Sequence, residues 1–247
     1  MSGLRQSEGL PFPSATGSVP AVTAAQMAEV DRLAVARYGI ELLQMMENAG
    51  GALARVVRSL WPHRTAVTVL AGGGGNGGGA LAAARRLAAQ GLEVTVVVDR
   101  PLSQLRGAAA HQAATLEKME VAFLPEPGEA TLVVDGLIGY GLDRRPHGRA
   151  AELIRWAQGA SAVISLDVPS GVDATTGRRH GPHVLPEVTL TLALPKTGLT
   201  PANSGTVLLA DIGIPPVLYS RHLRVDAARV FTAGDIVDVT PHLRRSA

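Results

Sequence analysis

Residues 65–91, TAVTVLAGGGGNGGGALAAARRLAAQG, decide the fold class of this chain. The apolar run TAVTVLA predicts a buried strand, and the segment from Asn76 onward predicts a helix. Residues 72–79 hold seven glycines around that one asparagine. Because glycine is the costliest residue to order, this density indicates a backbone that something approaches closely. A flexible turn in a chain rich in Ala and Gly is the alternative, and the loop by itself leaves both open.

The alternation of strand and helix continues on both sides of this unit. Two helices are predicted before it, over 23–39 and 41–60. After it come predicted helices over 103–119 and 150–158 and predicted strands over 93–99, 131–137, 161–167, 188–194 and 206–213. Such alternation with short connections is typical of a doubly wound, mostly parallel α/β sheet. We expect one domain over residues 21–247, after a loose arm over residues 1–20 that is rich in Gly, Pro and Ser.

The composition sets limits on the function. Of the 247 residues, 46% are hydrophobic but only 3% are aromatic, which predicts an aliphatic core. The formal charge is +2 and no basic stripe carries interleaved aromatics, so nothing favours nucleic-acid binding. The chain has no cysteine, which excludes disulfides and cysteine nucleophiles. Neither a signal peptide nor a run long enough to cross a membrane is found, and we expect a cytoplasmic protein.

Polar residues collect where the predicted strands end, which is where sheets of this kind bind ligands. Gly72, Gly74 and Gly77 satisfy G-x-G-x-x-G in one of several registers, and Asp99 ends the next strand as a ribose-binding acid would. By this pattern alone the chain could be a hydride-transferring dehydrogenase. The physical consequence is an anion-friendly pocket, because the loop leads into a helix N-terminus.

The other strand-end residues allow two interpretations each. Asp135 is either an acid of a ligand site or the cap of a turn, and Lys196 either holds a phosphate or is a solvated loop residue. For Asp167 and Ser170 the position favours function, whereas Asp173 is expected to cap a turn. The histidines are dispersed and show no zinc-ligand spacing.

Seven segments in order carry a resemblance to one known family: TAAQMAEVD (23–31), LLQMMENAG (42–50), the glycine loop with LAAARRLAAQG (81–91), LVVDGLIGYGL (132–142), SLDVPSGVDATTG (165–177), LALPKTGL (192–199) and ADIGIPP (210–216). Together they resemble the YjeF N-terminal domain family, whose enzymes are NAD(P)H-hydrate epimerases. The resemblance implies a Rossmann-like three-layer α/β sandwich with a mostly parallel central sheet. It also implies an enzyme that interconverts the R and S hydrates of NADH and NADPH in cofactor repair.

The resemblance also implies site residues. The family's potassium ligands match Asn76, Asp135 and Ser170, which offer the oxygen ligands that a hard cation takes. Asp167 matches a substrate contact and is the candidate acid/base residue. The other implied substrate contacts are Gly75, Asn76, Gly77, Gly78, Gly79, Gly139, Tyr140, Gly141, Leu142, Asp143, Arg144 and Arg145. Asn48 is either a further pocket residue or a helix-packing residue.

The chain departs from the family pattern in the loop. The family usually reads Gly-Asn-Asn-Gly-Gly-Asp-Gly, and here Gly75 and Gly79 replace the first asparagine and the aspartate. The alternative function is therefore a catalytically weakened domain that binds an adenine nucleotide or a protein partner without turnover. The expected partners are the hydrates of NADH and NADPH as substrate and a separate hydrate dehydratase. A homodimer is the form common in the family.

Overall fold

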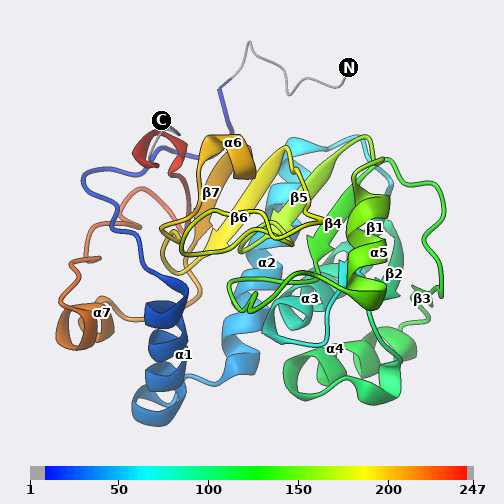
Figure 1. Cartoon of the computed structure of the whole chain (residues 1–247), viewed down its shortest axis with the longest axis horizontal. Coiled ribbons are helices and arrows are strands. Elements are labelled where there is room, and N and C mark those ends of the chain that lie inside the picture. Colours follow the sequence, from blue (N-terminus) through cyan, green and yellow to red (C-terminus); the bar gives the residue numbers. More distant parts are fainter. Residues whose placement is uncertain (1–8, 244–247) are drawn as a thin grey trace.

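A single mixed sheet runs through the computed structural model, which describes residues 9–243 (Figure 1). The strand order is β3-β2-β1-β4-β5-β6-β7-β8, with all neighbours parallel except the antiparallel pair β7–β8. The strands are β1 (Ala66–Ala71), β2 (Glu93–Val98), β3 (Ala122–Phe123), β4 (Val133–Gly136), β5 (Val163–Leu166), β6 (Val188–Leu192), β7 (Thr206–Ala210) and β8 (Ile236–Asp238). The expected mostly parallel sheet is confirmed.

Helices cover both faces of this sheet, which gives three layers. Val69, Val96 and Val134 pack in the larger core with residues of α2, α3 and α4. On the opposite face, Val133 and Val163 pack against α5. The period of two along each strand thus separates the two cores. The helices are α1 (Ala24–Tyr38), α2 (Leu42–Leu60), α3 (Gly75–Ala89), α4 (Gly107–Lys118), α5 (Gly148–Ala157), α6 (Pro201–Ser204) and α7 (Pro216–Leu223), with 3-10 turns η1 (Leu102–Gln104) and η2 (Thr240–His242).

The predicted elements correspond to observed ones, with differences at the edges of the sheet. The helix expected over 103–119 begins only at Gly107, because the 3-10 turn η1 precedes it. The edge strands β3 and β8 and the short helices α6 and α7 were not expected. These elements are short, so they carry too few residues for a periodic pattern. Among residues 9–243, no helix is long and apolar enough to span a bilayer.

The segment expected to form a loose arm is tied to the domain in its described part. The Ala15 N–H donates to the Asp238 carbonyl at 2.9 Å, and the Asp238 N–H donates to the Pro13 carbonyl at 2.8 Å. Phe12 and Val19 pack against the larger core. The expectation of a loose arm is therefore wrong for this stretch, because backbone pairing with the edge strand β8 and apolar contacts fix it. Residues 1–8 of the expected arm lie outside the described residues.

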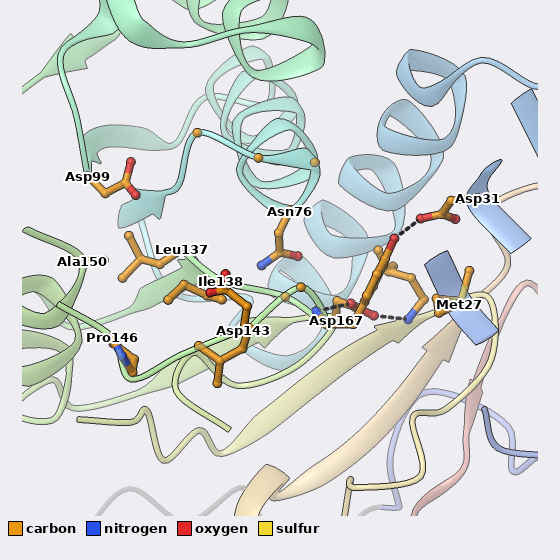
Figure 2. Close-up of a pocket in the computed structure, with 18 of the residues that line it drawn as sticks. Met27, Asp31, Asn76, Asp99, Leu137, Ile138, Asp143, Pro146, Ala150 and Asp167 are labelled. Atoms are coloured by element: carbon orange, nitrogen blue, oxygen red, sulfur yellow. Dashed lines mark hydrogen bonds between the residues drawn. The ribbon is translucent and has the colours of Figure 1, made fainter. Parts of the chain in front are cut away.

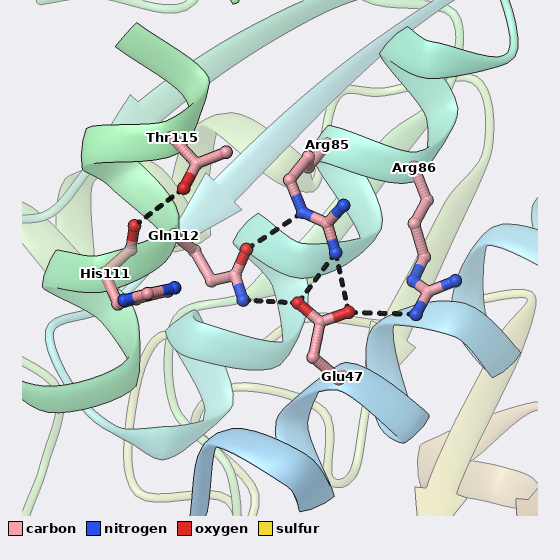
Figure 3. A network of polar contacts seen from close by, with 6 residues as sticks. All are labelled: Glu47, Arg85, Arg86, His111, Gln112 and Thr115. Atoms are coloured by element: carbon pink, nitrogen blue, oxygen red, sulfur yellow. Dashed lines mark hydrogen bonds and ion pairs between the residues drawn. The ribbon is translucent and has the colours of Figure 1, made fainter. Parts of the chain in front are cut away.

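A polar network joins α2, α3 and α4 (Figure 3). Arg85 Nη2 donates to both Glu47 carboxylate oxygens, at 2.7 and 2.6 Å, and Arg86 Nη2 donates at 2.9 Å. Gln112 Nε2 donates to the same carboxylate at 2.7 Å, and Gln112 Oε1 accepts from Arg85 Nε at 3.1 Å. Burial by itself raises the pKa of Glu47, but these donors outweigh it and hold that pKa below its ordinary value. One carboxylate therefore links three helices.

We expect Glu47→Gln to lower the free energy of unfolding by about 1 kcal/mol at neutral pH, because the network is partly open to water and screened. A depressed carboxyl pKa stabilises the fold above the unfolded value, and this contribution is lost as the pH falls through the folded value. The deficit of the variant should therefore shrink as the pH falls below about 4.3, the ordinary value for Glu, and vanish below the depressed folded pKa. Urea titrations at neutral pH and at an acidic pH measure the deficit in the free energy of unfolding. Glu29→Gln, which removes an exposed pair with Arg32, is the control and should change nothing; a deficit independent of pH contradicts the prediction.

Candidate functional site

A cavity of about 810 Å³ opens at the carboxyl ends of the central strands (Figure 2). Residues of α1 and α2 form its apolar wall: Met27, Val35, Leu42, Met45 and Met46. The opposite wall is the segment 137–150, which follows β4. The glycine loop after β1 and the ends of β5 and β6 close the floor. The cavity thus lies where the strand order reverses between β1 and β4, as doubly wound sheets predict.

The glycines of residues 72–79 serve two different purposes. A Cβ atom at Gly72 would lie 2.0 Å from the Leu137 carbonyl oxygen, and one at Gly77 would lie 1.7 Å from the Gly72 carbonyl oxygen. Both glycines are therefore required by backbone packing. Gly74 has open space around it and lines the cavity together with Gly73. The predicted close approach is therefore confirmed at Gly72 and Gly77, where the approaching group is the protein's own backbone.

The implied loop contacts divide in the same way. Gly75 and Asn76 line the cavity, whereas Gly77, Gly78 and Gly79 do not. Gly78 faces Ala108 of α4, and Gly79 faces the side chain of Leu166. The structure therefore turns these last three positions toward the protein interior. The implied contacts after β4 all line the cavity: Gly139, Tyr140, Gly141, Leu142, Asp143, Arg144 and Arg145.

Asp135 lies beneath the cavity and is fully buried at the end of β4. Its carboxylate accepts hydrogen bonds from Ser170 Oγ at 2.6 Å, Ser170 N at 2.9 Å, Ser165 Oγ at 2.8 Å and Leu137 N at 3.3 Å. Burial raises the pKa of Asp135, because these donors are neutral and offset only part of the loss of water. Among the described residues, no cationic side chain pairs with it.

Asn76 brings a buried polar side chain to the cavity. Its side-chain nitrogen and oxygen are both buried, and neither has a hydrogen-bond partner among residues 9–243. A Cβ atom at Gly139 would lie 3.2 Å from Asn76 Oδ1 and 3.1 Å from Asp167 Oδ2, so these two groups flank the same glycine. A buried amide without partners costs free energy, which marks this position as a place for a ligand.

Asp167 is held in place at the end of β5 by a buried ion pair. Lys196 Nζ donates to Asp167 Oδ1 and, at 2.9 Å, to the Leu192 carbonyl. Asp167 Oδ2 accepts from the Tyr140 N–H at 3.2 Å, and the Asp167 backbone has a φ of +66°, which is uncommon outside glycine. Lys196 is only 1% exposed. The expectation of a solvated Lys196 is wrong, because its side chain is buried and its charge pairs with Asp167, whereas its role as a phosphate ligand stays a prediction.

Asp31 of α1 is a cavity residue that the sequence did not single out. Its carboxylate accepts a 2.5 Å hydrogen bond from the Tyr140 hydroxyl (Figure 2). Burial raises the pKa of Asp31, and burial together with the Asp31 charge raises the pKa of Tyr140. The signal was available, since Met27, Asp31 and Val35 recur every four residues and therefore share one face of a helix.

Of the remaining candidates, Asn48 and Asp173 have structural roles, whereas Asp99 lies at the cavity. Asn48 donates to the Ile212 carbonyl at 3.0 Å and does not line the cavity, so it packs α2 against a loop. Asp173 accepts from the Thr175 and Thr176 N–H groups at 3.0 and 2.7 Å, which confirms the capped turn. Asp99 lies at the rim of the cavity beside Arg100.

A glycine loop between β1 and α3, with a cavity at the carboxyl edge of a doubly wound sheet, defines a Rossmann-like α/β domain. The chain belongs to the family described as YjeF-related protein N-terminus, whose profile matches residues 42–198. It is 46% identical over 243 residues to an NAD(P)H-hydrate epimerase of Dehalogenimonas lykanthroporepellens, covering 94% of this chain and 98% of that protein.

Two further comparisons agree with this assignment. A bifunctional NAD(P)H-hydrate repair enzyme Nnr of Salinibacter ruber is 34% identical over 82% of this chain, which corresponds to 42% of that protein. The crystal structure of yeast ynu0 superposes with a TM-score of 0.77 at 22% identity, over 89% of this chain and all of that one. The likeness to the yeast structure supports the assignment of the fold.

The two glycines that depart from the family loop should respond differently to restored side chains. A Cβ at Gly79 meets Leu166 Cδ2 at 2.9 Å and Met46 Sδ at 3.4 Å, so Gly79→Asp places a carboxylate among apolar groups. We expect it to lower the free energy of unfolding by about 2 kcal/mol or more. Gly75→Asn meets only Leu42 Cδ1 at 3.9 Å and should be tolerated. Denaturant titration measures both, and Gly79→Ala separates the steric part; equal stability of the two restored variants contradicts the prediction.

The Asp167–Lys196 pair should be strongly coupled in stability. Lys196→Met leaves the Asp167 carboxylate buried without its cation, and we expect a loss of about 3 kcal/mol. The double variant Asp167→Asn, Lys196→Met removes both charges and should recover part of that loss. Urea titrations of the unaltered protein, the single variants Asp167→Asn and Lys196→Met, and the double variant give the coupling energy. Strictly additive losses would show that the pair is not an interacting unit.

Proposed function

We propose that this chain interconverts the R and S hydrates of NADH and NADPH, which are cofactors damaged by addition of water to the nicotinamide ring. The observation that carries the proposal is the Asp167 carboxylate, fixed by Lys196 and the Tyr140 N–H, next to the unpartnered Asn76 amide in one cavity. Relatives named NAD(P)H-hydrate epimerase, which match most of the chain, support it.

We assign the inversion of the hydrated carbon to breakage of its carbon–oxygen bond and formation of that bond again on the other face of the ring. The leaving hydroxyl takes a proton and departs as water, while the electron pair of the adjoining ring nitrogen forms a carbon–nitrogen double bond. Water then adds from the opposite face and gives up a proton. Asp167 is the group we assign to this proton movement, because its Oδ2 lies at the cavity and its Oδ1 is held by Lys196. Lys196 acts as a positioning residue.

Potassium is the proposed cofactor, and the residues beneath the cavity fit a cation. Asn76 Oδ1 is buried without a donor, and the Asp135 carboxylate is buried without a cationic partner among the described residues. Asn76, Asp135 and Ser170 would hold the ion through an amide oxygen, a carboxylate and a hydroxyl, as a hard cation prefers. When bound, it would supply a fixed positive charge at the floor of the cavity. The contribution of the protein would be to hold these three oxygens in position around the ion.

The proposal also covers partners. The substrate is a small molecule, and we infer that the epimer which a dehydratase cannot use is converted here into the one that it can. Relatives named bifunctional repair enzymes, in which the matched region is 39–42% of the protein, support a functional link of this kind. A separate dehydratase, a homodimer and a cytoplasmic location stay predictions.

The test is incubation of the protein with one purified hydrate epimer, followed by chromatography of the epimer ratio over time. We expect conversion above the spontaneous rate, enhanced by potassium, and a loss of at least about 100-fold in Asp167→Asn. Asp173→Asn, in the same segment but in a capped turn, is the matched control and should retain the rate. An epimer ratio that follows the spontaneous rate, with and without potassium, would overturn the epimerase and favour a domain that binds without turnover.

A further inference from the structure

A second, shallow groove of about 520 Å³ continues from the cavity along the carboxyl ends of β2 and β3. Asp99, Arg100 and Arg149 line both depressions, so the two are continuous. The floor of the groove is apolar: Val98, Pro101, Leu102, Phe123, Leu124 and Pro125. Leu124 is 43% exposed there, which is high for a leucine. The reaction proposed above does not use this surface.

The polar rim of the groove is a bidentate ion pair between Arg100 and Asp99. Arg100 Nε and Nη2 donate to the two oxygens of Asp99 at 2.8 and 2.9 Å. The Asp99 side chain is 8% exposed, so its carboxylate is oriented rather than freely solvated. A carboxylate has about four acceptor sites, and two remain after the Arg100 contacts. The pair can therefore offer both an acceptor and a guanidinium to one ligand.

The Arg100 side chain connects this rim to the glycine loop. A Cβ atom at Gly73 would lie 2.5 Å from Arg100 Nε and 2.8 Å from its Cδ, so the guanidinium crosses directly over Gly73. Any larger residue at position 73 would displace it. Arg149, the third shared residue, is engaged by Glu126 and Glu152 at 3.0 and 3.1 Å. Of these two arginines, Arg100 is the one that adjoins the loop.

We propose that the groove is the adenosine subsite of the dinucleotide substrate, with Asp99 accepting from the ribose hydroxyls and Arg100 binding a 2′-phosphate when one is present. The inference rests on the proposed function and deepens it. In a doubly wound sheet the dinucleotide crosses the glycine loop, and an acid after the second strand meets the ribose. The order β3-β2-β1-β4-β5 places the groove on the opposite side of the loop from Asp167. The apolar floor suits a flat base.

The paired charges explain how one subsite takes both forms of the cofactor. With Asp99 and Arg100 joined, the rim has no net charge, and a ribose hydroxyl meets the free acceptor sites of the carboxylate. A 2′-phosphate meets the guanidinium instead, and its charge-assisted hydrogen bonds offset the partial loss of the Asp99 contact. The two side chains therefore have opposite effects on selectivity, which makes the proposal testable in both directions.

The experiment compares ADP-ribose and 2′-phospho-ADP-ribose binding by calorimetry, together with the kcat/KM ratio for the NADPH and NADH hydrates. Arg100→Leu should lower selectivity for the phosphorylated forms about tenfold, and Asp99→Asn should raise it about tenfold. Leu124→Trp, which fills the groove at an exposed position, should weaken both ADP-ribose ligands and leave nicotinamide mononucleotide unaffected. Arg55→Leu and Asp235→Asn break an exposed ion pair outside both depressions and are the matched controls.

The outcomes separate this inference from the proposed function. Binding of ADP-ribose with the expected variant effects, but without epimerisation, supports the subsite while the epimerase fails. Epimerisation with a selectivity ratio unchanged in Arg100→Leu and Asp99→Asn, or undiminished ADP-ribose binding in Leu124→Trp, overturns the subsite while the epimerase stands. Absence of ADP-ribose binding by the unaltered protein also overturns it.

Discussion

The close approach of α3 to its neighbours is the constraint on which the site depends. A Cβ at Gly50 of α2 would lie 2.5 Å from the Cβ of Ala82, and one at Gly136 of β4 would lie 2.2 Å from the Cβ of Ala80. An Ala- and Gly-rich helix is therefore pressed between α2 and the sheet, with no room for a longer side chain at these contacts. This packing fixes the N-terminus of α3 and hence the position of Asn76 at the floor of the cavity.

Two carboxylates at the ends of neighbouring strands are stabilised in different ways. Asp135 is surrounded by neutral donors and lies beneath the cavity, whereas Asp167 is paired with Lys196 and has one oxygen at the cavity. Lys196 follows β6 and Tyr140 follows β4, so three strand ends converge on Asp167. The uncommon backbone conformation of Asp167 is held by these contacts, as expected for a residue whose orientation matters to function.

The sequence was informative where a pattern is local. The hydrophobic pattern predicted β1 and α3. The acids at the ends of β4 and β5 could be placed together because parallel strands end at one edge of the sheet. The Asp167–Lys196 pair could not, since its members are 29 residues apart and a lone Lys after a strand resembles a surface residue. The spacing along α1 places Asp31 on one helix face with Met27 and Val35, but its hydrogen bond with Tyr140, 109 positions later, could not be predicted. The direction of Gly77, Gly78 and Gly79 depends on helix phase, which a glycine run does not reveal.

The packing around Gly79 bears on the question that the glycine loop first raised. If the chain had simply lost a carboxylate there, an open polar gap facing the cavity would be expected. Instead, Leu166 Cδ2, Met46 Sδ and Ala49 Cβ surround the position where its side chain would begin, and Gly79 does not line the cavity. Apolar side chains thus fill the space where that carboxylate would begin. In the proposed epimerase, proton transfer is assigned to Asp167, the carboxylate that lines the cavity beside Asn76, and the altered loop is compatible with that assignment.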